Sequence, residues 1–225
     1  MNFSSLGIFA ALSLFLVLPS LATDITTHLS PKLKELHPEM YDCEAAKTRT
    51  KVYRVQNRLD MFMRRLRSFI HETVFDVAGF DLRLEKLNRT HARLENLAKS
   101  NDPCISRLNP QFNFARKMFQ VMIDSAEIMK FYKLENGLAQ SLIHKTAQLN
   151  VRVLALYNHN GSPDPRINDF STTVFLLEYL VHSWAKIFEN VENVEPSLLL
   201  AFCTEFFKAD ETLENLGRYF SELEA

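Results

Sequence analysis

Apolar side chains recur at steps of three and four residues along most of this 225-residue chain, the spacing that places them on one face of an α-helix. Between 80 and 98 the two steps alternate as in a heptad seam, with His91 in a core-type position. The periodicity predicts six helices, at about 39–77, 80–99, 110–135, 138–158, 166–192 and 197–225.

Glycines and prolines fall between these stretches. In a helix interior, glycine costs about 1 kcal/mol and proline about 3 kcal/mol relative to alanine. We therefore expect Ala78-Gly79 to end the first helix, and Asn109 to cap the third, with Pro110 as its first residue. The chain is predicted to be all-α, with one domain over 39–225 that forms a single antiparallel bundle of about five to six helices.

The first 22 residues have the layout of a secretory signal. Residues 6–18 are apolar, and Ser20 and Ala22 are small residues at the −3 and −1 positions of a cleavage site. The alternative is an uncleaved anchor, but the apolar run falls short of the roughly 20 residues that span a bilayer. We expect a cleaved signal peptide at 1–22, an extended arm at 23–38, and a secreted, extracellular chain without a transmembrane segment.

The chain has three cysteines, an odd number for a secreted protein. Cys43 and Cys104 lie near predicted helix ends, whereas Cys203 lies in a strongly apolar stretch. We expect a Cys43–Cys104 disulfide, which makes the protein stabler by about 4 kcal/mol in the chain-entropy model, and a buried, free Cys203. An interchain bridge through Cys203 is the alternative.

Charge is unevenly distributed, although the formal net charge is only −1, which argues against a nucleic-acid partner. Residues 24–100 hold 15 basic and 11 acidic residues, and residues 165–225 hold 4 and 11. The first predicted helix carries a candidate binding patch for an anionic partner, formed by Lys47, Lys51, Arg54, Arg58, Arg64 and Arg65. The alternative is a solvated face paired with acidic residues of the last helix, namely Glu205, Asp210, Glu211 and Glu214.

Two N-glycosylation sequons lie beyond the leader, at Asn88 and Asn160. Asn88 falls in a predicted helix and needs a solvent-facing side, and Asn160 falls in a predicted loop. We expect a glycoprotein with both asparagines as candidate acceptors.

The sequence offers no catalytic or metal-binding motif, so we expect neither enzymatic activity nor a cofactor. A helical metal site needs ligands one turn apart. Glu178 and His182 have that spacing, but one pair is more typical of an ion pair.

Two functions remain. The first is a secreted, non-enzymatic helical binding protein that recognises an extracellular protein or glycan. Such a protein is similar to cytokine-like or effector-like helical bundles in architecture alone and shares no motif with them. The second is a secreted carrier of a hydrophobic small molecule such as a lipid, because the third helix is rich in phenylalanine and methionine. Those side chains can equally form an ordinary core.

Overall fold

A computed structural model describes residues 43, 46–71, 74–100, 102–164, 166–167 and 169–224. The expected signal peptide at 1–22 and arm at 23–38 lie outside these residues. The chain divides into two compact units, one formed by 1–53 with 102–104 and the other by 54–101 with 105–225. A single domain over 39–225 stays a prediction.

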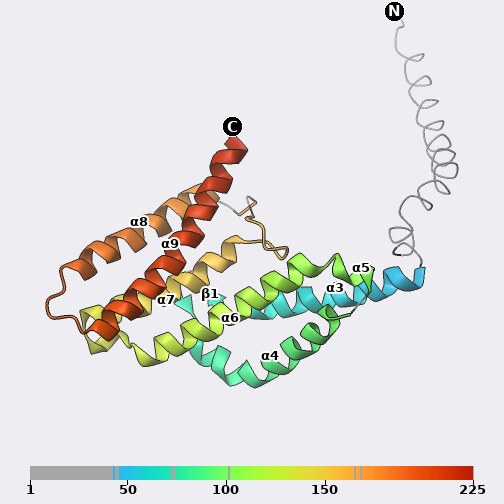
Figure 1. The fold of residues 1–225 in the computed structure, drawn as a ribbon, viewed down its shortest axis with the longest axis horizontal. Helices are drawn as coiled ribbons and strands as arrows, with labels where there is room; N and C mark the ends of the chain where they lie inside the picture. The colour runs from blue at the N-terminus through green and yellow to red at the C-terminus, as the bar shows by residue number, and fades with distance from the viewer. Residues whose placement is uncertain are drawn as a thin grey trace, which may run out of the picture. The chain divides into compact units, whose positions relative to one another are not determined.

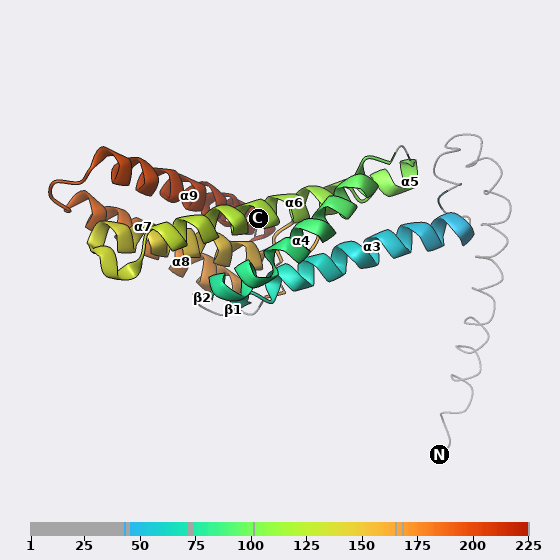
Figure 2. The ribbon, with the colours of Figure 1, turned by 90° about the horizontal axis from the view of Figure 1, so that it is seen from below.

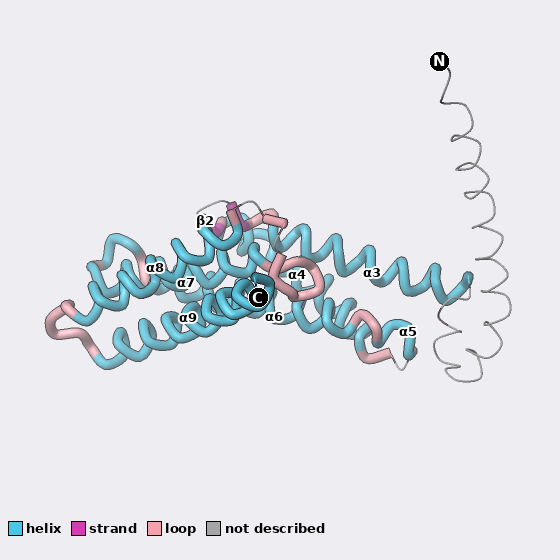
Figure 3. Tube along the Cα trace, turned by 90° about the horizontal axis from the view of Figure 1, so that it is seen from above, coloured by secondary structure: helices cyan, strands magenta, loops and turns pink. Residues whose placement is uncertain are grey.

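The described residues are mostly helical, which confirms the all-α class (Figure 1). The α-helices, in order, are α3 (Ala46–Arg67), α4 (Val77–Ala98), α5 (Pro103–Ser106), α6 (Asn109–Phe131), α7 (Leu138–Val153), α8 (Phe170–Glu189) and α9 (Pro196–Glu224). Two short 3₁₀ helices, Leu134–Asn136 and Leu154–Leu156, flank α7. Two strands of two residues each, β1 (Ile70–His71) and β2 (Val74–Phe75), lie between α3 and α4 (Figure 3).

The first predicted helix ends earlier than expected. It stops at Arg67 instead of Val77, and Ile70 pairs with Phe75 in an antiparallel hairpin. β-Branched and aromatic residues favour strand conformation there, and Asp76 caps α4 by accepting a hydrogen bond from the Gly79 backbone N–H at 2.9 Å.

Gly79 therefore lies in the first turn of α4, and its interpretation as a helix end is wrong. A Cβ at this position would collide with the Asp76 carboxylate. The colliding atoms are the end of a flexible side chain, so a larger residue at this position requires Asp76 to shift.

Several other boundaries also shift. Asn109 is the first residue of α6 rather than its cap; Leu108 precedes it and makes no side-chain capping bond. A short helix, α5, occupies part of the predicted break near 103. The fifth predicted helix, α8, is shorter at both ends.

Helix α7 packs against three other helices of the second unit, α6, α8 and α9. Half of its sixteen residues are buried, from Leu142 to Val153. Its C-terminal half joins a cluster with one face of α8 and α9, in which Leu149, Val181 and Leu213 are almost fully enclosed. Helices α8 and α9 run side by side from the turn that joins them (Figures 1 and 2).

The expected disulfide pair lies in the first unit. Cys43 and Cys104 lie at disulfide distance with their Cα atoms 5.4 Å apart, and both are buried. Nearby, Lys51 donates to the Asp102 carboxylate at 2.6 Å. Cys203, in the second unit, is free, but it is half-buried rather than buried as predicted.

None of the helices in the described part of the chain combines the length and apolar character that a membrane crossing requires.

Candidate functional site

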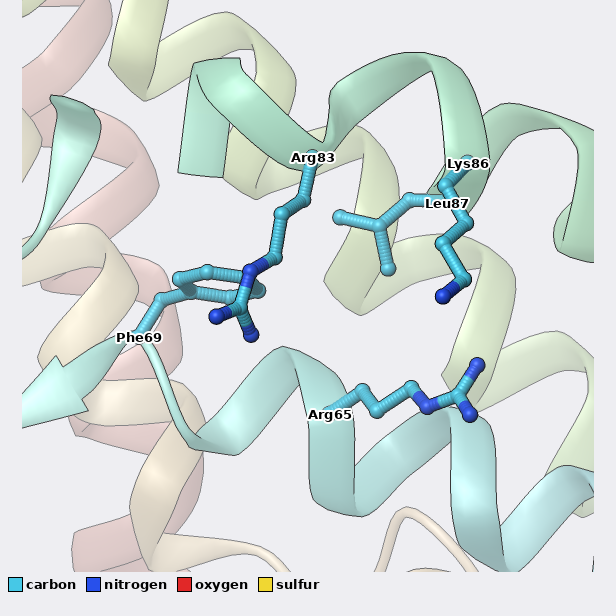
Figure 4. Close-up of a pocket in the computed structure, with 5 residues that line it drawn as sticks. All are labelled: Arg65, Phe69, Arg83, Lys86 and Leu87. Carbon is cyan, nitrogen blue, oxygen red and sulfur yellow. The ribbon is translucent and has the colours of Figure 1, made fainter. Parts of the chain in front are cut away.

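A basic surface of the second unit lies between α3 and α4. Two hollows there share Arg65, and we call them together the basic groove. The first has a volume of about 460 Å³ and is lined by Arg65, Phe69, Arg83, Lys86 and Leu87 (Figure 4). The second has a volume of about 300 Å³ and is lined by Arg58, Met61, Phe62, Arg65, Thr90, Arg93, Leu94 and Leu97.

The local sequence explains how the two walls form. The β1–β2 hairpin reverses the chain, so α4 runs back along α3 (Figure 2). On α3, Arg58 and Arg65 are seven residues apart, which is close to two helical turns. Lys86 and Arg93 have the same spacing on α4. Each wall therefore presents its cations in a row.

Five cationic side chains line this groove and all are exposed: Arg58, Arg65, Arg83, Lys86 and Arg93. Within the described ranges, no acidic side chain lines either hollow. In Figure 4 the Arg65 guanidinium and the Lys86 ammonium reach toward each other from opposite walls. Like charges that converge in this way repel one another, so an anion placed between them is favoured.

The acidic residues of α4 form ion pairs with residues that do not line the groove. Glu85 contacts Arg89 at 3.4 Å, Glu95 contacts Arg116 at 2.8 Å, and Asp81 contacts Lys130 at 3.0 Å. On α3, Asp60 is two residues from Arg58 and hence on nearly the opposite side of the helix. The positive charge of the groove is therefore not cancelled by its own helices.

Apolar side chains form the floor of the groove. Leu87 and Leu94 are each 3% exposed, and Phe62 is 1% exposed. Met61 is different, because 56% of it is exposed to solvent. The Arg83 guanidinium carbon lies 5.8 Å from the centre of the Phe69 ring, a cation–π arrangement. A ligand in this groove meets both positive charge and apolar surface.

An aromatic cluster holds the two walls in place. The Phe62 ring of α3 lies 5.5 Å from Phe119 of α6 and 5.9 Å from His91 of α4, measured between ring centres. Burial lowers the pKa of His91, and the neighbouring Glu95 carboxylate opposes this shift. The His91 Nε2 to Glu95 Oε1 distance is 3.5 Å. His91 is thus a half-buried packing residue rather than the fully buried one that a core-type position predicts.

The structure separates the members of the predicted basic patch. Arg58 and Arg65 line the groove, and Arg54 is exposed one turn before Arg58. Arg64 is also exposed but lies on another face of α3. Lys47 and Lys51 belong to the first unit, where Lys51 pairs with Asp102.

The second wall was missed by sequence reasoning. Arg83, Lys86 and Arg93 come from α4, and no prediction included them. The available signal was the seven-residue spacing of Lys86 and Arg93, each directly before a leucine of the heptad seam. A residue directly before a seam position lies beside the apolar stripe, so cations at such positions form a row along its edge.

The acidic residues expected to pair with α3 have other partners. Glu205 accepts hydrogen bonds from Lys208 and Asn150, at 2.7 and 2.8 Å. Asp210 contacts His182 at 3.0 Å, so the expected Glu178–His182 pair is wrong. Glu214 contacts Arg218 at 3.6 Å, and Glu211 lines a hollow with Glu205.

The Glu205 region is a second polar site, between α6, α7 and α9. The hollow beside it has a volume of about 130 Å³. Glu205 is 2% exposed, and Asn150 is also buried. Burial of a carboxylate without partners is very unfavourable, so the two hydrogen bonds explain how Glu205 is tolerated there.

Both predicted glycosylation sites are exposed. Asn88 is two residues from Lys86 and from Thr90, which places it across α4 from the groove. Asn160 lies in the loop after α7, and its side-chain oxygen accepts a hydrogen bond from Gln111 at 2.6 Å. Occupancy at both sites stays a prediction.

Comparison with known proteins adds no relative: no family model, no curated protein and no solved structure matches this chain. Among the described residues, no cluster of three or more histidine, cysteine, aspartate or glutamate side chains is arranged to hold a metal ion.

Proposed function

We propose that this chain is a secreted, non-enzymatic binding protein that recognises an anionic extracellular macromolecule through the basic groove. The observation that supports this function is the convergence of five exposed cations on a surface lined, in the described part of the chain, by no acidic side chain. The apolar leader supports secretion, as does the Cys43–Cys104 pair, because disulfides persist in oxidising compartments.

Charge alone is too weak to account for specific binding. Five exposed ion pairs at about 0.2–1 kcal/mol each supply about 1–5 kcal/mol. A dissociation constant of 1 μM corresponds to about 8 kcal/mol. The remaining free energy has to come from further contacts, and exposed apolar surface in the groove, above all Met61, contributes about 25 cal/mol for each Å² that is buried. The ligand therefore carries negative charge together with apolar groups.

A charge-reversal experiment tests this function. The variant Arg65→Glu/Arg93→Glu changes both walls of the groove, and Arg107→Glu/Lys133→Glu is the matched control because it changes net charge equally at exposed side chains that line neither hollow. Binding of the mature chain to polyglutamate, a sulfated glycan and anionic vesicles is measured at two salt concentrations.

We expect the groove variant to lose at least about tenfold in affinity for at least one probe, and the control to lose much less. We also expect wild-type affinity to fall as salt is raised, because exposed charges are screened. Equal losses in both variants would mean that only net charge matters and would contradict the proposal.

The alternative, a carrier of a hydrophobic small molecule, is favoured by one observation. The second hollow of the groove is mostly apolar and its volume of about 300 Å³ is at the small end of the range for ligand pockets. Two methionines of the third predicted helix, Met118 and Met122, are fully buried, as expected for an ordinary core. Native mass spectrometry of protein purified from its source tests this function, since a carrier retains a bound lipid.

A further inference from the structure

We infer that the ligand of the basic groove is an acidic amphipathic helix of another protein. This inference rests on the proposed function and specifies the partner that the groove is shaped to bind. It is carried by the spacing of charges on the two walls, by the exposure of Met61 at the edge of the groove, and by the length of the groove.

The two walls repeat with the same period. Arg58 and Arg65 on α3, and Lys86 and Arg93 on α4, are each seven residues apart. Seven residues is the period at which a helix returns to the same side when it packs along another helix. A third helix lying between the walls thus meets cations at a constant spacing on both of its flanks.

The floor has the same repeat. Leu87 and Leu94 are also seven residues apart and follow directly after the two α4 cations. They are covered from below, but Met61, from the opposite wall, is 56% exposed at the edge of the second hollow. An adaptable thioether side chain suits contact with an incoming apolar residue. Since Leu87 and Leu94 are almost fully covered, the exposed apolar contact that the groove offers beside its basic rows is mainly Met61.

The length of the groove matches a short helix. Arg83 and Arg93 are ten residues apart, which corresponds to roughly 15 Å of α-helix, or about three turns. An amphipathic helix of that length places apolar residues at i, i+3 or i+4, and i+7 into a groove. Glu or Asp on both sides of its apolar stripe completes the charge complementarity.

Other anionic macromolecules satisfy only part of this surface. A sulfated glycan matches the cations but has no apolar stripe for the floor. An anionic membrane presents a broad surface, whereas both hollows are recessed between two helices. The acidic helix satisfies the walls and the floor together.

The test uses the mature full-length chain and two synthetic peptides of about four turns. One places leucines along one face with glutamates on both flanks, and the other has the same composition in an order that is not amphipathic. A sulfated glycan and anionic vesicles serve as further probes. Affinity is measured by titration calorimetry and peptide helicity by circular dichroism.

We expect the amphipathic peptide to bind about tenfold more tightly than its scrambled form, and to gain helicity on binding, because only it places its leucines on the floor. Met61→Gln should lower the affinity for this peptide about fivefold and leave the affinity for the glycan unchanged. Leu176→Gln on α8 is the matched control, since Leu176 is 52% exposed and lies outside the groove; it should change neither.

Several results would overturn the inference. Equal affinity for both peptides, or tighter binding of the glycan or the vesicles, overturns the acidic helix and leaves the proposed function standing. Failure of every probe to bind overturns both. A homodimer of the free chain, seen in sedimentation and lost in Arg65→Glu/Arg93→Glu, assigns the groove to a second copy and also overturns the inference.

Discussion

The basic groove and the Glu205 site place charge in opposite settings. In the groove, five cations lie exposed, and no acidic side chain of the described residues lines it. In the other site, one carboxylate is 2% exposed and accepts hydrogen bonds from Lys208 and Asn150. A buried charge needs partners for the protein to fold, whereas an exposed charge does not.

This difference separates structural charge from charge that is available for a ligand. The Asn150–Glu205 hydrogen bond links α7 to α9, and Lys208, also on α9, pairs with the same carboxylate. We expect the loss of either contact to lower the free energy of unfolding. Among the groove cations, Arg83 contacts the Phe69 ring. The side chains of Arg65 and Arg93 make no ion pair or hydrogen bond among the described residues, and we expect their removal to affect binding only. The following predictions test this comparison, from the largest expected effect on stability to the smallest.

Lys208→Met removes the cation beside Glu205 and keeps a similar apolar stem. Breaking a fully buried pair costs about 3–5 kcal/mol; because Lys208 is 45% exposed, we expect a smaller loss of about 2 kcal/mol in the free energy of unfolding, measured with urea. Lys117→Met is the control, since Lys117 is exposed at the same hollow. Equal stability of Lys208→Met and wild type would show that the buried carboxylate does not need its cation.

Asp76→Ala removes the cap that starts α4, the second wall of the groove. Loss of an N-cap side chain costs about 1 kcal/mol, and we expect that decrease in unfolding free energy. Thermal or urea unfolding measures it. Asp76→Asn keeps a capping oxygen, so its unfolding free energy should fall by only a small part of that amount. If Asp76→Asn and Asp76→Ala lose equal unfolding free energy, loss of the cap does not explain the decrease.

His91→Phe should remove part of the pH dependence of stability. The pKa of His91 is lowered mainly by burial, with Glu95 and Arg116 acting in opposite directions. A histidine with a lowered folded pKa contributes its full stability above its ordinary pKa of about 6.5 and loses it as the pH falls toward the folded value. Urea unfolding at pH 7.5 and pH 5.5 should show a smaller decrease for His91→Phe than for wild type.

Arg65→Gln/Arg93→Gln should have the smallest effect on stability. Surface substitutions away from structural contacts stay within about 0.5 kcal/mol, and relief of repulsion between like charges favours a slight gain. Urea unfolding at low salt measures it. A loss above about 1 kcal/mol would mean that these arginines hold the fold together and would remove the contrast with Glu205.

The sequence predicted the helices well because burial of one face imposes the three-and-four spacing. It failed at the hairpin because Phe69, Thr73 and Val77 continue that spacing past the end of α3. Periodicity alone cannot separate such a continuation from two short strands, and the Asp76 cap was the deciding local signal.

For a related reason, only the α3 wall of the groove could be predicted from the sequence. Charge on one helix can be counted from the sequence, so Arg58 and Arg65 were found. The contribution of α4 depends on which helix folds back beside α3, a tertiary contact that spacing does not contain. The same limit explains why the position of Glu205 was not predicted. It was expected to be a surface partner of α3 and is instead buried against Asn150.

The most direct test of the account is a map of where an acidic ligand binds. The isotopically labelled mature chain is titrated with the acidic amphipathic peptide, and backbone chemical-shift changes are followed by nuclear magnetic resonance. We predict changes concentrated between 58 and 69 and between 83 and 97, with little change in α8. Changes spread evenly over all basic residues, or centred away from α3 and α4, would contradict the basic groove as the binding site.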